Sequence, residues 1–62
     1  MATFEIFKRV DGKFDWRLKS ANGEIIATAG QGFHTKGGAE VGIAAVKRDA
    51  ATADTKDLTG TR

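Results

Sequence analysis

Residues 14–28 constrain the fold most, because they join an alternating strand, a turn dipeptide and a second β-rich run. Side chains of the first run alternate between an apolar and a charged face: Phe14, Trp16 and Leu18 against Asp15, Arg17 and Lys19. Asn22 and Gly23 favour a two-residue type I′ turn, because both residues tolerate positive φ. The stretch therefore predicts a β-hairpin with strands at about 13–20 and 24–29.

A preceding strand is predicted at about 3–9, ended by Asp11 and Gly12. A two-residue loop would place Glu5 opposite Leu18 and mix charged with apolar side chains. A three-residue loop over residues 10–12, with Gly12 left-handed, instead aligns the apolar positions of the two strands. We predict this second register, with the pairs Phe4 and Leu18, Ile6 and Trp16, Glu5 and Arg17.

In this register the sheet has two distinct faces. The apolar face is expected to carry Phe4, Ile6, Phe14, Trp16, Leu18, Ile25 and Ala27. The other face is expected to carry Glu5, Phe7, Arg9, Asp15, Arg17, Lys19, Ile26 and Thr28. The apolar face needs a cover.

An amphipathic helix over about 36–50 is predicted to provide that cover. Thr35 is a suitable N-cap, and an apolar stripe follows at helical spacing: Ala39, Ile43, Val46 and Ala50. Gly42 lies beside the stripe and allows a close approach to the sheet. Because glycine costs up to about 1 kcal/mol in a helix interior, we expect packing to stabilise this helix.

The chain length limits what the fold can bury. With 62 residues we expect one domain, and such a chain buries only about 60% of its unfolded surface. It has no Cys and one His, so we expect neither a disulfide nor a zinc site. Oligomerisation is then the remaining way in which a chain of this size could gain stability. A charge of +2 is too small to indicate a polyanion partner. We find no signal peptide or membrane span, and expect a soluble, cytoplasmic protein.

Several motifs together resemble the YegP-like family of small bacterial and archaeal proteins. They are residues 4–8 (FEIFK), 16–19 (WRLK), 21–26 (ANGEII), 32–36 (GFHTK), and Gly42-Ile43 with Val46-Lys47. The resemblance implies an α+β fold with a β-β-β-α-β protomer, in which an antiparallel sheet packs on one helix. It also implies that single-copy members dimerise, share one sheet and exchange C-terminal strands. The family has no established activity, so it supplies no functional residues.

For this chain the resemblance implies a homodimer whose exchanged strand spans about 53–59. Leu58 is the only large apolar residue after Ala51, and we expect it to anchor that strand on the partner. Gly37 and Gly38 depart from the helix formers more usual in relatives.

Residues 30–38 are glycine-rich and lie between a predicted strand and the predicted helix. Their spacing does not match a dinucleotide-binding loop. The amides of Gly37 and Gly38 together with Lys36 form a candidate anion site at the helix N-terminus, against the alternative of a flexible connection. His34 and Ser20 are interpreted as structural or solvated, and no catalytic or metal-ligating set is predicted.

A second candidate site is the charged sheet face, where Arg9, Arg17 and Lys19 surround Phe7. Proteins that bind single-stranded nucleic acid combine cations with aromatic rings in this way. Glu5 and Asp15 cancel much of that charge, so a salt-bridged face is the favoured interpretation.

The sequence as a whole predicts a small, non-catalytic homodimeric binding or accessory protein without a cofactor. One alternative is a weak nucleic-acid binder that uses the charged face. The other is an anion or small-molecule binder at Lys36, Gly37 and Gly38.

Overall fold

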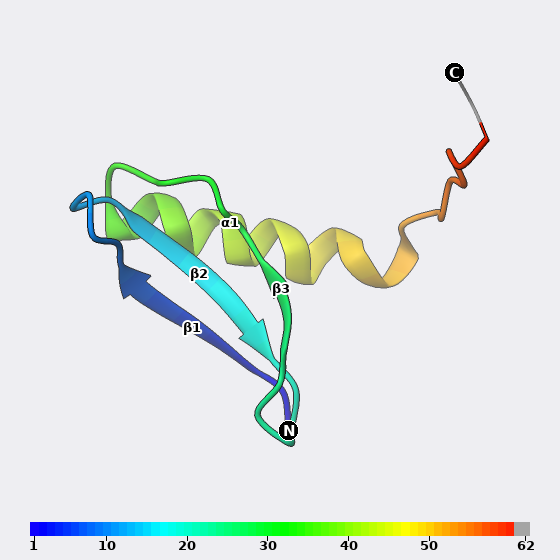
Figure 1. The fold of residues 1–62 in the computed structure, drawn as a ribbon, viewed down its shortest axis with the longest axis horizontal. Helices are drawn as coiled ribbons and strands as arrows, with labels where there is room; N and C mark the ends of the chain where they lie inside the picture. Colours follow the sequence, from blue (N-terminus) through cyan, green and yellow to red (C-terminus); the bar gives the residue numbers. More distant parts are fainter. Residues whose placement is uncertain (61–62) are drawn as a thin grey trace.

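The computed structural model describes residues 1–60 and shows a three-stranded antiparallel sheet crossed by one helix (Figure 1). The strands β1 (Thr3–Lys8), β2 (Phe14–Lys19) and β3 (Ile25–Thr28) lie in the order β1-β2-β3. The helix α1 (Lys36–Asp49) follows, and a single 3₁₀ turn, η1 (Ala50–Thr52), extends it. The predicted α+β class is confirmed.

The predicted register between β1 and β2 is also confirmed. Phe4 pairs with Leu18, Glu5 with Arg17, and Ile6 with Trp16. Arg9 N donates to Lys13 O at 2.7 Å and Gly12 N to Arg9 O at 3.0 Å, which closes a three-residue loop. Gly12 takes a φ of 84°, a left-handed value that glycine adopts without steric cost.

The predicted type I′ turn between β2 and β3 is wrong. Ser20 N donates to Glu24 O at 2.8 Å and Gly23 N to Ser20 O at 2.9 Å, so this loop also has three residues. Gly23 has a φ of 91°, whereas no non-glycine residue among 1–60 has a positive φ, Asn22 included. The longer loop needs only one left-handed residue, and its Asn22 side chain accepts a hydrogen bond from the Ser20 hydroxyl.

A bulge shifts the register between β2 and β3 at Leu18 and Lys19. Lys19 pairs with Ile25 and Leu18 with Ala27, so Ile26 is the extra residue of β3. The prediction that Ile25 joins the apolar face is therefore wrong, since Ile25 lies opposite Lys19 and is 55% exposed. Ala27 does lie opposite Leu18, but α1 packs on β1 and β2 and leaves β3 uncovered.

The hydrophobic core is small and centres on Trp16. The buried apolar residues among 1–60 are Trp16, Ala39 and Ile43. Partly buried side chains surround them: Phe4, Ile6, Phe14, Ala29, Phe33 and Val46. The rings of Phe4 and Trp16 meet edge to face with centroids 5.5 Å apart.

The start of α1 and its approach to the sheet follow from two residues. Thr35 Oγ1 accepts a hydrogen bond from Gly38 N at 3.0 Å, as expected of an N-cap. A Cβ atom on Gly42 would lie 3.0 Å from Trp16 Nε1 and 3.0 Å from Phe33 Cζ. Glycine at this position therefore lets the helix backbone rest against the Trp16 and Phe33 rings.

The C-terminal part of the chain extends beyond the sheet. Figure 1 shows the last turns of α1 and the segment that follows projecting clear of all three strands. Residues 53–58 belong to no helix or strand of this chain, and all of them are exposed. An exchanged strand would pair with a second copy, so the predicted strand at about 53–59 stays a prediction.

Candidate functional site on the open sheet face

The sheet face turned away from α1, here called the open face, carries a cluster of charged side chains around Glu5. Arg17 Nε donates to Glu5 Oε1 at 2.7 Å, and Lys19 Nζ lies 3.9 Å from Glu5 Oε2. The Arg17 hydrogen bond and the nearby Lys19 charge hold the pKa of Glu5 below its ordinary value. Arg17 also covers the Phe7 ring, with Cζ 5.0 Å from the ring centroid.

A second cluster surrounds Arg9 at the end of β1. Its guanidinium lies 3.3 Å from a carboxylate oxygen of Asp11 and 3.4 Å from one of Asp15. Asp15 is only 4% exposed, and it also accepts a hydrogen bond from Trp16 N at 3.0 Å. The sequence places Asp15 on the charged face but gives no sign that it is buried.

The connection between β3 and α1 runs against this second cluster. A Cβ atom on Gly32 would lie 2.7 Å from Arg9 Nη1, so the backbone of the connection contacts the guanidinium directly. Gly32 has a φ of 71°, which is a second reason for glycine here. Gly32 is the one residue whose type indicates this contact in the sequence. The glycines around it were instead interpreted as a flexible connection or an anion site.

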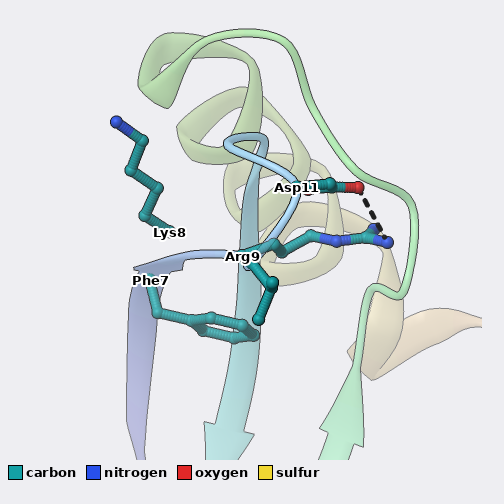
Figure 2. A pocket seen from close by; sticks show the side chains of 5 residues that line it. Phe7, Lys8, Arg9 and Asp11 are labelled. Atoms are coloured by element: carbon teal, nitrogen blue, oxygen red, sulfur yellow. Dashed lines mark ion pairs between the residues drawn. The ribbon is translucent and has the colours of Figure 1, made fainter.

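Beside Arg9 the open face contains a hollow of about 610 Å³, lined by Phe7, Lys8, Arg9, Val10 and Asp11. Figure 2 shows the Arg9 side chain directed at Asp11, with the Phe7 ring on the side of Arg9 away from Asp11. Lys8 extends away from this ion pair (Figure 2), and its Nζ lies 5.8 Å from the centroid of the Phe14 ring. The hollow therefore has apolar walls and a cation whose charge two carboxylates balance.

The structure brings together the four residues of the predicted nucleic-acid face: Phe7, Arg9, Arg17 and Lys19. Each of the three cations lies between 2.7 and 3.9 Å from a carboxylate oxygen. Three carboxylates thus face three cations, and Arg17 already occupies one side of the Phe7 ring. This geometry favours a salt-bridged surface over one prepared for phosphates and bases.

The predicted anion site at the start of α1 has little geometry to support it. Gly38 N already donates a hydrogen bond to Thr35 Oγ1, while Lys36, Gly37 and His34 are exposed.

Within residues 1–60, no three His, Cys, Asp or Glu side chains lie close enough together to hold a metal ion. No helix in the same part of the chain is long and apolar enough to cross a membrane.

A third surface lies where α1 extends past the sheet. A hollow of about 340 Å³ is lined by Ala45, Val46, Asp49, Ala50 and Ala53. Leu58 in the following segment is 64% exposed. Val46 and Ala50 belong to the predicted apolar stripe of the helix, but Ala50 is exposed. The apolar stripe is therefore longer than the part of the helix that this chain's own sheet covers.

Comparison with known proteins gives consistent results. The model of a family described as "Domain of unknown function (DUF1508)" matches residues 10–57. A "UPF0339 protein" of Treponema denticola is 45% identical over 47 residues, which cover 76% of this chain and 79% of that protein. The "UPF0339 protein Atu0232" of Agrobacterium fabrum is 39% identical over 59 residues, covering 95% of this chain and 94% of the relative.

Solved structures show the same fold. The solution structure of a protein from Haloferax volcanii matches with a TM-score of 0.85 and 43% identity, covering 90% of this chain and 93% of that chain. The solution structure of ATU0232 from Agrobacterium tumefaciens matches with a TM-score of 0.76 and 38% identity, covering 97% and 95%. The predicted resemblance to YegP-like proteins is confirmed.

Proposed function

We propose that this chain, which belongs to the DUF1508 family of unknown function, acts as a non-catalytic homodimer with a binding or accessory role. The observation that carries the proposal is that residues 1–60 bury only three apolar residues and leave apolar surface open around them. That surface includes Ile25, Ile26 and Leu58, each more than half exposed in the single chain.

The size of the core supports dimerisation. A chain of 62 residues has little stability to spare, and this one has no disulfide. The hollow at Val46 and Ala50 and the exposed Leu58 are apolar surfaces that a second copy would bury. In the proposed dimer, residues 53–59 of each chain form a strand on the partner, and Leu58 anchors it.

The arrangement of reactive side chains supports a non-catalytic role. The Ser20 hydroxyl donates to the Asn22 side chain, and His34 lies exposed in a loop. The carboxylates of Glu5, Asp11 and Asp15 are each occupied by an arginine. Within residues 1–60 none of these groups forms the nucleophile and base pair that covalent catalysis needs.

Sedimentation equilibrium tests the assembly. We expect the intact chain to be a dimer at micromolar concentration, and a chain ending at Ala51 to be unfolded or aggregated, because it lacks the exchanged strand. A folded monomer of the intact chain would contradict the proposed dimer. A stable dimer of the shortened chain would contradict the exchanged strand.

Native mass spectrometry of the protein purified gently from its own cells tests the binding role. We expect the dimer to carry a second molecule at a fixed stoichiometry. A dimer that carries no other molecule under any mild condition would contradict a binding or accessory role while leaving dimerisation intact.

A further inference from the structure

The hollow beside Arg9 presents apolar surface next to a cation. Phe7 and Val10 line it, and Val10 is fully exposed in the single chain. The Arg9 guanidinium belongs to the same lining and is directed at Asp11, away from the Phe7 ring (Figure 2). A ligand that fits this hollow therefore needs an apolar body and a group that pairs with a guanidinium.

The two carboxylates that balance Arg9 differ in exposure. The Asp15 side chain is 6% exposed and accepts a hydrogen bond from Trp16 N, whereas the Asp11 side chain is 45% exposed. Arg9 Nη2 lies 3.3 Å from Asp11 Oδ2, which is longer than a usual charge-assisted hydrogen bond. An exposed ion pair of this kind contributes little free energy, so a competing anion can replace it. Asp11 is thus the replaceable partner of Arg9, and Asp15 is the permanent one.

The charges around the hollow indicate the charge of its ligand. Lys8 and Arg9 are positive, while Asp11 and Asp15 are negative, so the group is balanced. Once Asp11 leaves the guanidinium, one negative charge restores the pairing. A carboxylate supplies this charge, and its two oxygens match the planar fork of an arginine. A dianionic phosphate would instead bring a second negative charge close to the buried Asp15.

We propose that the hollow beside Arg9 binds a small carboxylate with an apolar body, and that Asp11 occupies the guanidinium until this ligand replaces it. The apolar body of the ligand covers Phe7 and Val10. Asp11 suits such an exchange, because its other oxygen, Oδ1, accepts a hydrogen bond from Lys13 N at 3.0 Å that does not involve Arg9. The inference rests on the proposed binding role, to which it gives a site and a ligand class, and does not depend on the dimer.

Titration of the intact ¹⁵N-labelled protein with 3-phenylpropionate, followed by amide chemical shifts, tests the inference. We expect saturable shifts at residues 7–11, with a dissociation constant in the millimolar range for so small a ligand. Two probes serve as controls: 3-phenylpropanol lacks the charge, and inorganic phosphate lacks the apolar body. Each should bind about tenfold more weakly. The absence of saturable shifts, shifts centred elsewhere, or equal binding of either control would overturn the inference.

Asp11→Asn provides the sharper test, because it removes the competing charge and keeps the oxygen that accepts from Lys13 N. We expect Asp11→Asn to bind 3-phenylpropionate about threefold more tightly than the parent, as expected when an exposed ion pair no longer competes. Glu40→Gln is the matched control, because it changes the net charge equally from an exposed position on α1. It should bind as the parent does. Equal affinities of the two variants would contradict the role of Asp11.

The site and the proposed function can fail separately. If 3-phenylpropionate does not bind but native mass spectrometry finds another molecule on the dimer, the site is wrong and the binding role stands. If neither experiment finds a bound molecule, both are wrong. If 3-phenylpropionate binds at residues 7–11 of a monomer, the site is correct and the proposed dimer is wrong.

Discussion

At the scale of single residues, we expect Trp16 to contribute most to stability. It is 7% exposed, contacts Phe4 edge to face and is the only Trp of the chain. We expect Trp16→Ala to lower the free energy of unfolding by roughly 3 to 5 kcal/mol, enough to unfold much of the protein. Urea denaturation followed by circular dichroism measures this loss. A Trp16→Ala protein as stable as the parent would contradict the buried position of the ring.

A milder substitution at the same position separates packing from polarity. Trp16 Nε1 is buried and has no hydrogen-bond partner among the residues that the structure describes. Trp16→Phe removes this unsatisfied donor and keeps an aromatic ring, so we expect a smaller loss of stability than for Trp16→Ala.

Glu5 makes a pH-dependent contribution. Its pKa is lowered chiefly by the hydrogen bond from Arg17, so the stabilisation is present above the unfolded pKa of about 4.3 and is lost as the pH falls through the lower folded pKa. We expect the Glu5 carboxyl carbon to titrate below its ordinary value in an NMR pH series. Arg17→Leu should move this midpoint upward. An unchanged midpoint in Arg17→Leu would show that the ion pair does not form in solution.

At the scale of elements, the packing of α1 on β2 depends on Gly42. We expect Gly42→Ala to destabilise the protein, although alanine favours the helix by about 1 kcal/mol, because its Cβ would lie 3.0 Å from both Trp16 Nε1 and Phe33 Cζ. Gly37→Ala is the control on the same helix, where the new Cβ would meet only Thr35 Oγ1 at 3.8 Å. Thermal denaturation should rank Gly37→Ala above Gly42→Ala, and the reverse order would contradict this packing.

The two loops show what sequence alone can predict about these elements. The β1–β2 register was predictable because only one loop length keeps Glu5 away from Leu18. The length of the β2–β3 loop was not predictable, because Asn22-Gly23 suits a two-residue turn equally well. The bulge beside Lys19 was not predictable either, because it depends on the pairing of β2 with β3. The exposure of Ile25 follows from that bulge, which no local pattern in the sequence indicates.

The open face was predictable in composition but not in geometry. Alternation places Arg9, Arg17 and Phe7 on one side of the sheet, and the β1–β2 register predicts the pair of Glu5 with Arg17. The burial of Asp15 could not be predicted, because no local pattern in the sequence indicates it. Asp15 pairs with Arg9, and Gly32 comes close to Arg9 from a distant part of the sequence. Contacts between segments that are distant in the sequence leave no periodic pattern of residue types from which they could be predicted.

At the scale of the whole molecule, folding and association are expected to occur together. The single chain leaves Leu58, Ile25 and Ile26 exposed and, within residues 1–60, buries only three apolar residues, so most of its stability should come from the partner. The midpoint of thermal denaturation should then rise with protein concentration. A midpoint that is constant from micromolar to millimolar concentration would indicate a chain that folds alone.

Leu58 provides the sharpest test of this coupling. Leu58→Asp places a charge where the exchanged strand would meet the partner's core, and we expect it to weaken association by about 2 kcal/mol or more. Because folding depends on association, the denaturation midpoint should fall as well. Thr59→Asp adds the same charge one residue later, where an extended strand turns its side chain to the opposite face, and should have little effect. Sedimentation velocity and circular dichroism on both variants measure the two properties separately. If Leu58→Asp and Thr59→Asp dimerise equally well, Leu58 does not anchor the strand. If Leu58→Asp loses the dimer but keeps the thermal denaturation midpoint of the parent, each chain folds alone.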